Sequence, residues 1–256
     1  MLLEINHIKK SFGGVQAVKD VSLKLDKGHI VGIIGPNGAG KTTVLNLISG
    51  IYPIDSGEIL FNGQSLSKMP QYKIARLGIS RTFQNIRLFK GLTVLENVMT
   101  ALDPVTHYNL ASALLRAPSK VKCERANREK ALGVLKMVGL EQYKDESPFN
   151  LAYGLQRRVE LARAIVNEPE LLMLDEPAAG LNPSEIDDFI DLIKKLREHY
   201  GFGILFIEHR MRVVNELSEY IYVINFGDLL TEGLPEKVVN DPEVIKAYLG
   251  EEEDQA

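Results

Sequence analysis

A glycine-rich segment that ends in a lysine and two threonines is the part of the chain best suited to bind a phosphorylated ligand. Residues 35–42 read GPNGAGKT, which fits the spacing G-x-x-x-x-G-K-[ST]. Glycines let the backbone curl so that successive N–H groups point at phosphate oxygens. Lys41 can reach the β- and γ-phosphates of a nucleotide, and the Thr42 hydroxyl can ligate Mg²⁺. A glycine-rich turn with an exposed lysine is the simpler alternative.

The surroundings of this segment favour the phosphate-binding interpretation. An apolar strand is expected before it and a helix after it, and the positive end of that helix would face the same anion. We therefore assign contacts with a nucleotide to Gly35, Pro36, Asn37, Gly38, Ala39, Gly40, Lys41, Thr42 and Thr43.

Two adjacent acids at the end of a second apolar run could complete such a site. Asp175 and Glu176 follow the run 171–174 directly. A carboxylate at the C-terminal end of a parallel strand stands where ligands bind in sheets of this kind. We expect Asp175 to hold Mg²⁺, directly or through water, and Glu176 to orient and polarise an attacking water. The alternative is an acidic turn before Pro177.

Apolar runs and capping residues indicate the elements that position these groups. The first sixty residues read as short strands with turns. A helix is expected between Gly40 and Gly50, and another from Asn182, with Pro183 and Glu185 in its first turn. Strands buried on both faces of a mostly parallel sheet are expected at 30–34, 171–174, 203–207 and 220–225. Alternating strands and helices predict an α/β sheet of the doubly wound kind.

Strand signals vanish from about Thr93 to Asn150. Pro104 and Pro118 divide this stretch, and apolar residues at helical spacing suggest several helices: Leu110, Ala111, Leu114, Leu115, Ala131, Leu132, Leu135 and Val138. We interpret it as a helical subdomain inserted into the sheet domain; a long helical crossover is the alternative. The expected boundaries are 1–92 and 151–234 for a nucleotide-binding core, 93–150 for the helical subdomain, and 235–256 for a C-terminal helical extension with an acidic tail.

Composition narrows the classes of function. The chain has 256 residues with 45% hydrophobic content, enough for a packed core, and its net charge of −4 gives no electrostatic reason to expect nucleic-acid binding. Cys123 is the only cysteine, which excludes an intrachain disulfide and fits a reducing cytoplasm. The N-terminus lacks the apolar stretch of a signal peptide, and no run approaches the roughly 18–20 apolar residues that span a bilayer. A role at a membrane would therefore require a partner. The acidic residues 251–254 read as a solvated, frayed end.

The order of these motifs resembles that of the ABC ATPases, a branch of the P-loop NTPases. Residues 171–177 (LLMLDEP) are similar to that family's Walker B segment, and residues 151–158 (LAYGLQRR) stand where it has its LSGGQ signature. The resemblance covers nearly the whole chain. It is greatest to LivG-type ATP-binding subunits of branched-chain amino-acid transporters, in the stretches 81–89, 93–98, 175–183 and 244–250. The fold it implies is a mostly parallel core sheet, an antiparallel β part near the N-terminus and an inserted helical subdomain.

The resemblance also implies roles for side chains that spacing alone does not assign. Phe12 would stack on adenine, with Val18 packing beside it, although an ordinary core aromatic is the alternative for Phe12. Gln84 would touch Mg²⁺ or the attacking water, and its loop would sense a membrane partner. His209 would contact the γ-phosphate, although a lone histidine is more often structural. Together with Lys41 and Glu176, these residues form the expected catalytic set.

In this family, two subunits pack head to tail, and the signature of one closes over the ATP bound to the other. The residues expected to act in this way are Ala152, Tyr153 and Gly154. Two of them depart from the family pattern, since Ala152 replaces serine and Tyr153 replaces the first glycine. A lost hydrogen bond to a charged group costs about 1.5–3 kcal/mol. The LivG-type proteins that this chain resembles also have tyrosine before the glycine, and they work with a second, different ATPase subunit. The resemblance therefore implies the hypothesis of an unequal dimer, in which the partner supplies a more standard signature. Arg210 is a smaller departure, because an acidic residue often follows the histidine.

The function implied is ATP binding and hydrolysis with Mg²⁺, in a subunit on the cytoplasmic face of the membrane. Its partners would be a second ATPase subunit, transmembrane permease subunits and, indirectly, a solute-binding protein. Three alternatives stay open: an ABC ATPase with another cargo or an export role, a non-transport ABC protein acting on nucleic acid, and a regulatory module without turnover. The absence of sustained heptads disfavours the second, and Glu176 disfavours the third.

Overall fold

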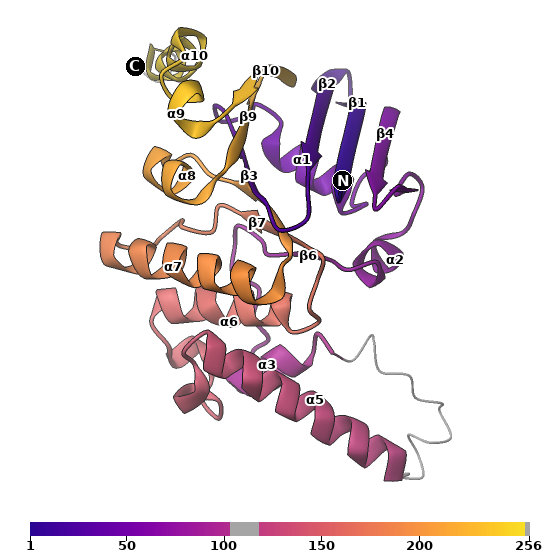
Figure 1. Ribbon diagram of the computed structural model, residues 1–256, viewed down its shortest axis with the longest axis vertical. Helices are drawn as coiled ribbons and strands as arrows, with labels where there is room; N and C mark the ends of the chain where they lie inside the picture. The colour runs from indigo at the N-terminus through magenta and orange to yellow at the C-terminus, as the bar shows by residue number, and fades with distance from the viewer. Residues whose placement is uncertain (103–117, 254–256) are drawn as a thin grey trace.

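A computed structural model describes residues 1–102 and 118–253, in which ten strands form one continuous sheet (Figure 1). The strand order is β5-β4-β1-β2-β10-β9-β3-β8-β7-β6. The strands are β1 (Leu3–Phe12), β2 (Val15–Leu25), β3 (Ile30–Ile34), β4 (Ser56–Phe61), β5 (Gln64–Ser65), β6 (Ile79–Arg81), β7 (Leu171–Asp175), β8 (Gly203–Ile207), β9 (Tyr220–Asn225) and β10 (Asp228–Gly233). The helices are α1 (Lys41–Ile48), α2 (Gln71–Arg76), α3 (Val94–Met99), α5 (Pro118–Met137), α6 (Tyr153–Ile165), α7 (Pro183–Tyr200), α8 (Met211–Leu217), α9 (Pro235–Val238) and α10 (Pro242–Glu253), with 3₁₀ turns at Glu141–Tyr143 and Pro148–Asn150.

The five strands β9, β3, β8, β7 and β6 are parallel and form the centre of the α/β core. Every residue of β3, β7 and β8 is buried, as the apolar runs predicted. Alternate side chains of a strand enter different cores because successive residues point to opposite faces. Ile30 and Ile34 join the core that contains α6 and α7, whereas Val31 and Ile33 join the core that contains α1.

The N-terminal part of the sheet is antiparallel, as expected, but its first strands are not short. β1 and β2 have 10 and 11 residues and form a hairpin around Gly13 and Gly14, both at positive φ. A tight turn with these left-handed residues lets the two strands remain paired along their length. β10 runs antiparallel to β9 and touches β2 at Asp20, which joins the two parts of the sheet.

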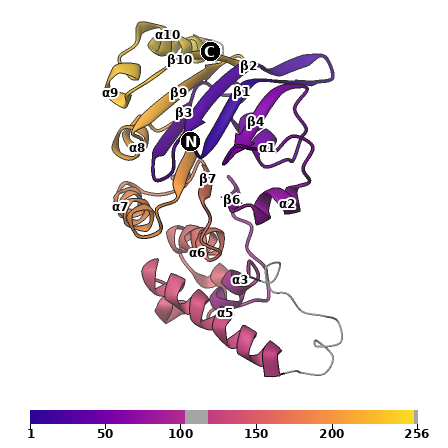
Figure 2. The same cartoon turned by 45° about the vertical axis from the view of Figure 1, so that its right-hand side comes forward.

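The described part of the segment from 93 to 150 carries helices and turns but no strand. α3 starts at a capping box between Thr93 and Glu96, and α3 and α5 pack on α6 through apolar side chains. Figure 2 shows α3 and α5 beyond α6, at the end of the molecule opposite α9 and α10. The apolar positions expected in helices from Leu110 to Leu115 lie outside the described residues.

Capping chemistry explains the long helix that follows the acidic pair. The side chain of Asn182 accepts from the backbone N–H of Glu185, and the Glu185 side chain accepts from the N–H of Asn182. Pro183 occupies the first turn, as predicted.

At the C-terminal end, α10 continues through Glu253, so the acids 251–253 extend a helix and do not form the frayed end that we expected. Within the described ranges, no helix has the length and apolarity that crossing a bilayer requires.

Candidate ATP-binding site

The register of the parallel strands brings the phosphate loop and the acidic pair to one edge of the sheet. Ile33 and Asp175 both pair with Ile207, from opposite sides of β8. Adjacent strands lie about 4.8 Å apart, so β3 and β7 end roughly 10 Å from one another. The loop that begins at Gly35 and the carboxylates of Asp175 and Glu176 therefore emerge at the same level.

The phosphate loop turns sharply at two glycines that pack directly on neighbouring backbone. Gly35 has a φ of 147°, and a Cβ there would lie 1.9 Å from the carbonyl oxygen of Ile224. Gly40 has a φ of 101°, and a Cβ there would lie 2.3 Å from the carbonyl oxygen of Ala17. Either side chain would collide with backbone that cannot move aside. Glycine is therefore required at both positions by space as well as by conformation.

The other residues assigned to the nucleotide lie along this loop and the first turn of α1. Pro36 and Ala39 are buried, Asn37, Gly38 and Thr42 are exposed, and Thr43 is half-buried. Lys41 is buried, and its Nζ donates to the carbonyl oxygens of Gly35 at 2.7 Å and of Pro36 at 2.6 Å. The ammonium group thus lies inside the curve of the loop, where phosphate oxygens could accept from it.

Asp175 forms a buried ion pair that the sequence did not predict. Its Oδ2 accepts from Arg81 Nη2 at 2.7 Å, and the two side chains are 4% and 7% exposed. Arg81 Nη1 donates to Asn46 Oδ1 on α1 at 2.8 Å and to Oγ of Ser49, the C-cap residue of α1, at 3.3 Å. One guanidinium thus joins β6, β7 and the helix that follows the phosphate loop.

Glu176 lies where three expected catalytic groups meet. Its Oε2 accepts from Gln84 Nε2 at 2.8 Å and lies 4.0 Å from His209 Nδ1. The Glu176 backbone has a φ of 47°, a left-handed conformation that costs a non-glycine residue roughly 1–3 kcal/mol. Its N–H donates to the carbonyl of Ile207 at 3.0 Å, which holds the strained turn in place.

A buried carboxylate fixes the backbone around His209. Glu208 is 0% exposed, and its oxygens accept from the N–H groups of Ala178, His209 and Arg210 at 3.0–3.2 Å. Arg210, whose role the sequence left open, donates from Nη1 to the carbonyl of Leu181 at 3.2 Å. The ends of β7 and β8 are therefore tied together on both sides of the histidine.

Comparison with known proteins agrees with this geometry. Residues 18–179 match the family profile described as ABC transporter, and residues 229–254 match the profile described as branched-chain amino acid ATP-binding cassette transporter. The chain belongs to the ABC transporter family. It is 47% identical over 250 residues to the high-affinity branched-chain amino acid transport ATP-binding protein LivG of Escherichia coli K12, covering 98% of each chain.

Solved ABC cassettes have the same fold. An ATP-binding cassette of an ABC transporter in its ADP conformation superposes with a TM-score of 0.84 at 30% identity, over 97% of this chain and 98% of that one. A dimeric cassette in a post-hydrolysis state with ADP and Pi gives 0.76 at 27% identity, over 91% and 99%. The chain is thus an ABC ATPase with the P-loop fold expected from its sequence, and it binds a nucleotide as the family does.

The residues expected to form the signature stand at the start of α6, beside the segment that follows the acidic pair. Ala152 is the N-cap residue of α6 and makes no side-chain capping hydrogen bond. The Tyr153 ring is 42% exposed and fills the space next to Gly180, where a Cβ would lie 2.7 Å from the ring. Gly154 lies close to Glu185, whose Oε1 would be 2.7 Å from a Cβ there. The tyrosine thus packs within its own subunit.

An arginine of the signature helix holds the loop that contains Gln84. Arg157 is 4% exposed, and it donates to the carbonyl of Phe83 at 3.0 Å and to that of Gln84 at 2.6 Å. It also pairs with the buried Glu160 at 3.2 Å. Burial raises the pKa of the Glu160 carboxyl above its usual value, while Arg157 acts in the opposite direction. Because Arg157 belongs to α6, a movement of the Gln84 loop would be transmitted to α6 through these hydrogen bonds.

Phe12 and Val18, the two residues expected to contact the adenine base, differ in their exposure to solvent. Phe12 is 39% exposed, lies edge-on to Tyr52 with ring centroids 4.9 Å apart, and has Lys10 Nζ 5.4 Å from its ring. Val18 is 1% exposed and packs beneath Gly40. Only the aromatic ring therefore has substantial surface free to meet a base, whereas the valine supports the loop.

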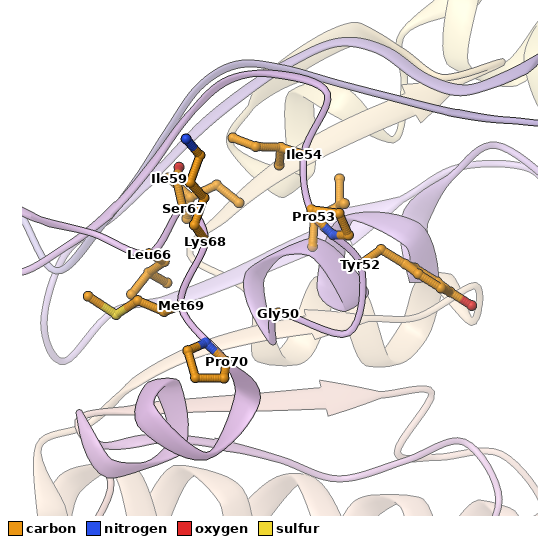
Figure 3. A pocket seen from close by; sticks show the side chains of 11 residues that line it. Gly50, Tyr52, Pro53, Ile54, Ile59, Leu66, Ser67, Lys68, Met69 and Pro70 are labelled. Carbon is orange, nitrogen blue, oxygen red and sulfur yellow. The ribbon is translucent and has the colours of Figure 1, made fainter.

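An apolar cavity near Tyr52 is separate from the residues expected to bind the nucleotide. Figure 3 shows its lining between the end of α1, β4 and the start of α2, with Tyr52, Pro53 and Met69 among the residues around it. None of the residues assigned to nucleotide or metal lines it. The phosphate-binding groups instead lie along an open loop, as expected for a site that a second subunit covers.

Sequence reasoning missed the buried residues that support the site, namely Arg81, Arg157 and Glu208. Each stands beside a recognised motif: Arg81 before the Gln84 loop, Arg157 in the signature helix and Glu208 before His209. A charged residue directly after a buried apolar strand was the available signal for Glu208, because such a charge must be paired. The partners, however, come from distant parts of the chain.

Proposed function

We propose that this ABC ATPase is the ATP-hydrolysing subunit of a branched-chain amino-acid importer. The proposal rests on the 47% identity to a LivG protein over nearly all of both chains, and on the match of residues 229–254 to the branched-chain profile. The hydrogen bond from Gln84 to Glu176, and the position of His209 4.0 Å from the same carboxylate, support turnover of ATP in place of passive nucleotide binding.

Hydrolysis transfers the γ-phosphoryl group to water, so positioning and charge stabilisation account for most of the catalysis. The loop N–H groups and Lys41 bind the phosphates. Glu176 accepts a hydrogen bond from the attacking water and aligns it, and Gln84, 2.8 Å from the same carboxylate, restricts where that carboxylate can point. His209, on the other side of Glu176, donates to the γ-phosphate.

The oxygen donors around the phosphate loop suit Mg²⁺. A hydroxyl from Thr42, a carboxylate oxygen from Asp175 and an amide oxygen from Gln84 are the ligand types that this ion prefers. Among the described contacts, Arg81 donates to Oδ2 of Asp175, and we assign the other oxygen, Oδ1, to the metal. When bound there, Mg²⁺ would neutralise charge on the β- and γ-phosphates.

The proposed working unit is a dimer of ATPase subunits on the cytoplasmic face of the membrane, bound to permease subunits and served by a solute-binding protein. ATP would close the dimer because its γ-phosphate touches the phosphate loop of one subunit and Ala152, Tyr153 and Gly154 of the other. Hydrolysis would remove that bridge and reopen it. The Gln84 loop, held by Arg157, would pass the movement to the permease and to α6.

Reconstitution tests the proposal directly. The chain should co-purify with its neighbouring permease subunits, and proteoliposomes that contain the complex should take up leucine, isoleucine and valine when ATP is supplied on the ATPase side. ATP-driven uptake of a different solute, or ATP-driven export, would refute the assignment of cargo or direction while leaving the ATPase activity intact.

The unequal-dimer hypothesis has its own measurement. Because Ala152 and Tyr153 depart from the family signature, a homodimer of this chain should hydrolyse ATP slowly, and a mixed dimer with the second ATPase subunit faster. Phosphate release per site is compared between the two assemblies at saturating Mg-ATP. Equal turnover per site would refute the hypothesis.

A further inference from the structure

The hydroxyl of a tyrosine near the C-terminal end contacts the first residue of the phosphate loop. The Gly35 N–H donates to Tyr248 Oη at 2.8 Å, across 213 positions of sequence. Tyr248 lies on α10, partly buried against the core that includes β9 residues. Figure 1 shows α10 at the same end of the molecule as β9 and β10. The segment that matches the branched-chain profile, residues 229–254, thus reaches back to the phosphate loop, which lies within residues 18–179 of the ABC transporter profile.

The Gly35 amide needs this partner because of where it stands. β3 ends at Ile34, Gly35 is buried, and the next residue, Pro36, has no N–H. The close approach to the Ile224 carbonyl, which excludes any Cβ at Gly35, also fixes the direction of the chain. A buried amide without an acceptor costs the free energy of its lost hydration. The hydroxyl therefore satisfies the amide at the point where the strand becomes the loop.

The same glycine residue holds the catalytic lysine. Its carbonyl oxygen accepts from Lys41 Nζ at 2.7 Å, so its N–H is fixed by Tyr248 and its C=O receives Lys41. A second contact from the C-terminal part of the chain secures the other side of the loop, where Gly227 N–H donates to the Ala39 carbonyl at 3.0 Å. The loop is thus fastened at both ends by residues beyond β9.

We propose that Tyr248 is a positioning residue for ATP binding: its hydroxyl fixes Gly35 and, through the carbonyl of Gly35, the Lys41 ammonium. The residue does not touch the nucleotide. Its effect should therefore be confined to ligands whose β-phosphate reaches Lys41, and should be small for a ligand that lacks one.

Tyr248→Phe in the full-length chain tests this, with Tyr200→Phe as the matched control. Tyr200→Phe also removes the hydroxyl of a half-buried tyrosine, which donates to Met137 Sδ at 3.5 Å from the last residue of α7. Calorimetry would measure the Kd of Mg-ATP, Mg-ADP and AMP. We expect Tyr248→Phe to weaken ATP and ADP binding about tenfold, as one hydrogen bond of about 1.4 kcal/mol implies, and AMP binding less than twofold. Tyr200→Phe should change none of them.

Equal weakening of AMP and ATP binding would overturn the proposal, since a general loss of structure would act on every nucleotide. An unchanged Kd for ATP would overturn it as well. Hydrogen exchange of the unmodified chain, labelled with ¹⁵N-glycine, provides a test that does not depend on a variant folding. The Gly35 amide should exchange slowly without nucleotide, and rapid exchange would contradict the hydrogen bond to Tyr248.

Discussion

The catalytic edge of the sheet and the signature turn at the start of α6 are built in different ways. At the edge, the ends of β3, β7 and β8 are set by a continuous ladder of backbone pairs, and buried charges lock the loops that follow. At the signature turn, the contacts are made by side chains: the Tyr153 ring against Gly180, and Glu185 beside Gly154. Side-chain contacts can be replaced more easily than a backbone ladder, which is consistent with a sequence that keeps the residues expected to be catalytic but departs from LSGGQ.

The largest effect is expected for Glu176→Gln, at the edge of the sheet where catalysis is expected. The amide cannot accept a proton or align water as a carboxylate does, so turnover should fall about 10²–10⁴-fold while ATP binding persists. Phosphate release and calorimetry with Mg-ATP measure the two effects, and ATP-bound dimers should accumulate. Glu216→Gln, on the exposed face of α8, is the control and should keep full turnover. Near-normal turnover of Glu176→Gln would remove Glu176 from its assigned role.

The second prediction concerns the stability that the buried ion pair between Arg81 and Asp175 provides. Arg81→Met leaves the Asp175 carboxylate buried without its partner and should lower the free energy of unfolding by about 3–5 kcal/mol. Adding Asp175→Asn should recover part of that loss, because the stranded charge is removed. Arg212→Met breaks ion pairs on the exposed side of α7 and α8, and should have little effect. Urea denaturation measures all of these. Equal stability of Arg81→Met and Arg212→Met would mean that the edge is not held by charge.

Glu208→Gln probes the link between the two strand ends. The glutamine NH₂ would face a backbone N–H in place of an oxygen, so at least one of the hydrogen bonds from Ala178, His209 and Arg210 is lost. We expect a loss of about 1–3 kcal/mol in the free energy of unfolding, with slower ATP hydrolysis because His209 is no longer fixed. Thermal unfolding and phosphate release on the same preparation test this. Full turnover with normal stability would show that Glu208 is dispensable.

The smallest effect is expected at the signature turn. Ala152 has a φ of −56° and a ψ of 151°, which suit a helix N-cap, but its side chain cannot accept a hydrogen bond. Ala152→Ser should therefore stabilise the chain by about 0.5–2 kcal/mol and raise turnover of the homodimer modestly. The control is Ala164→Ser. Ala164 lies within α6, where no unpaired backbone N–H is available for a serine hydroxyl to cap, so no stabilisation is expected. A stabilised variant with unchanged homodimer turnover would show that the missing hydroxyl does not limit catalysis.

Local chemistry determined much of this protein. The glycines of residues 35–42, the apolar runs of β3, β7 and β8, and the capping box at Asn182 each specify their structure through neighbours in sequence. These signals were sufficient to predict the α/β core, the phosphate loop and the acidic pair, because backbone conformation, side-chain periodicity and helix capping act over a few residues.

Tertiary structure alone decided how the site is supported. Arg81 meets Asp175 across 94 positions, Arg157 meets the Gln84 carbonyl across 73, and Tyr248 meets Gly35 across 213. None of these pairings leaves a local pattern, since each depends on the strand order and on which face of a helix turns inward. A buried charge or hydroxyl in the sequence predicts that a partner exists, and only the packed fold determines which residue it is.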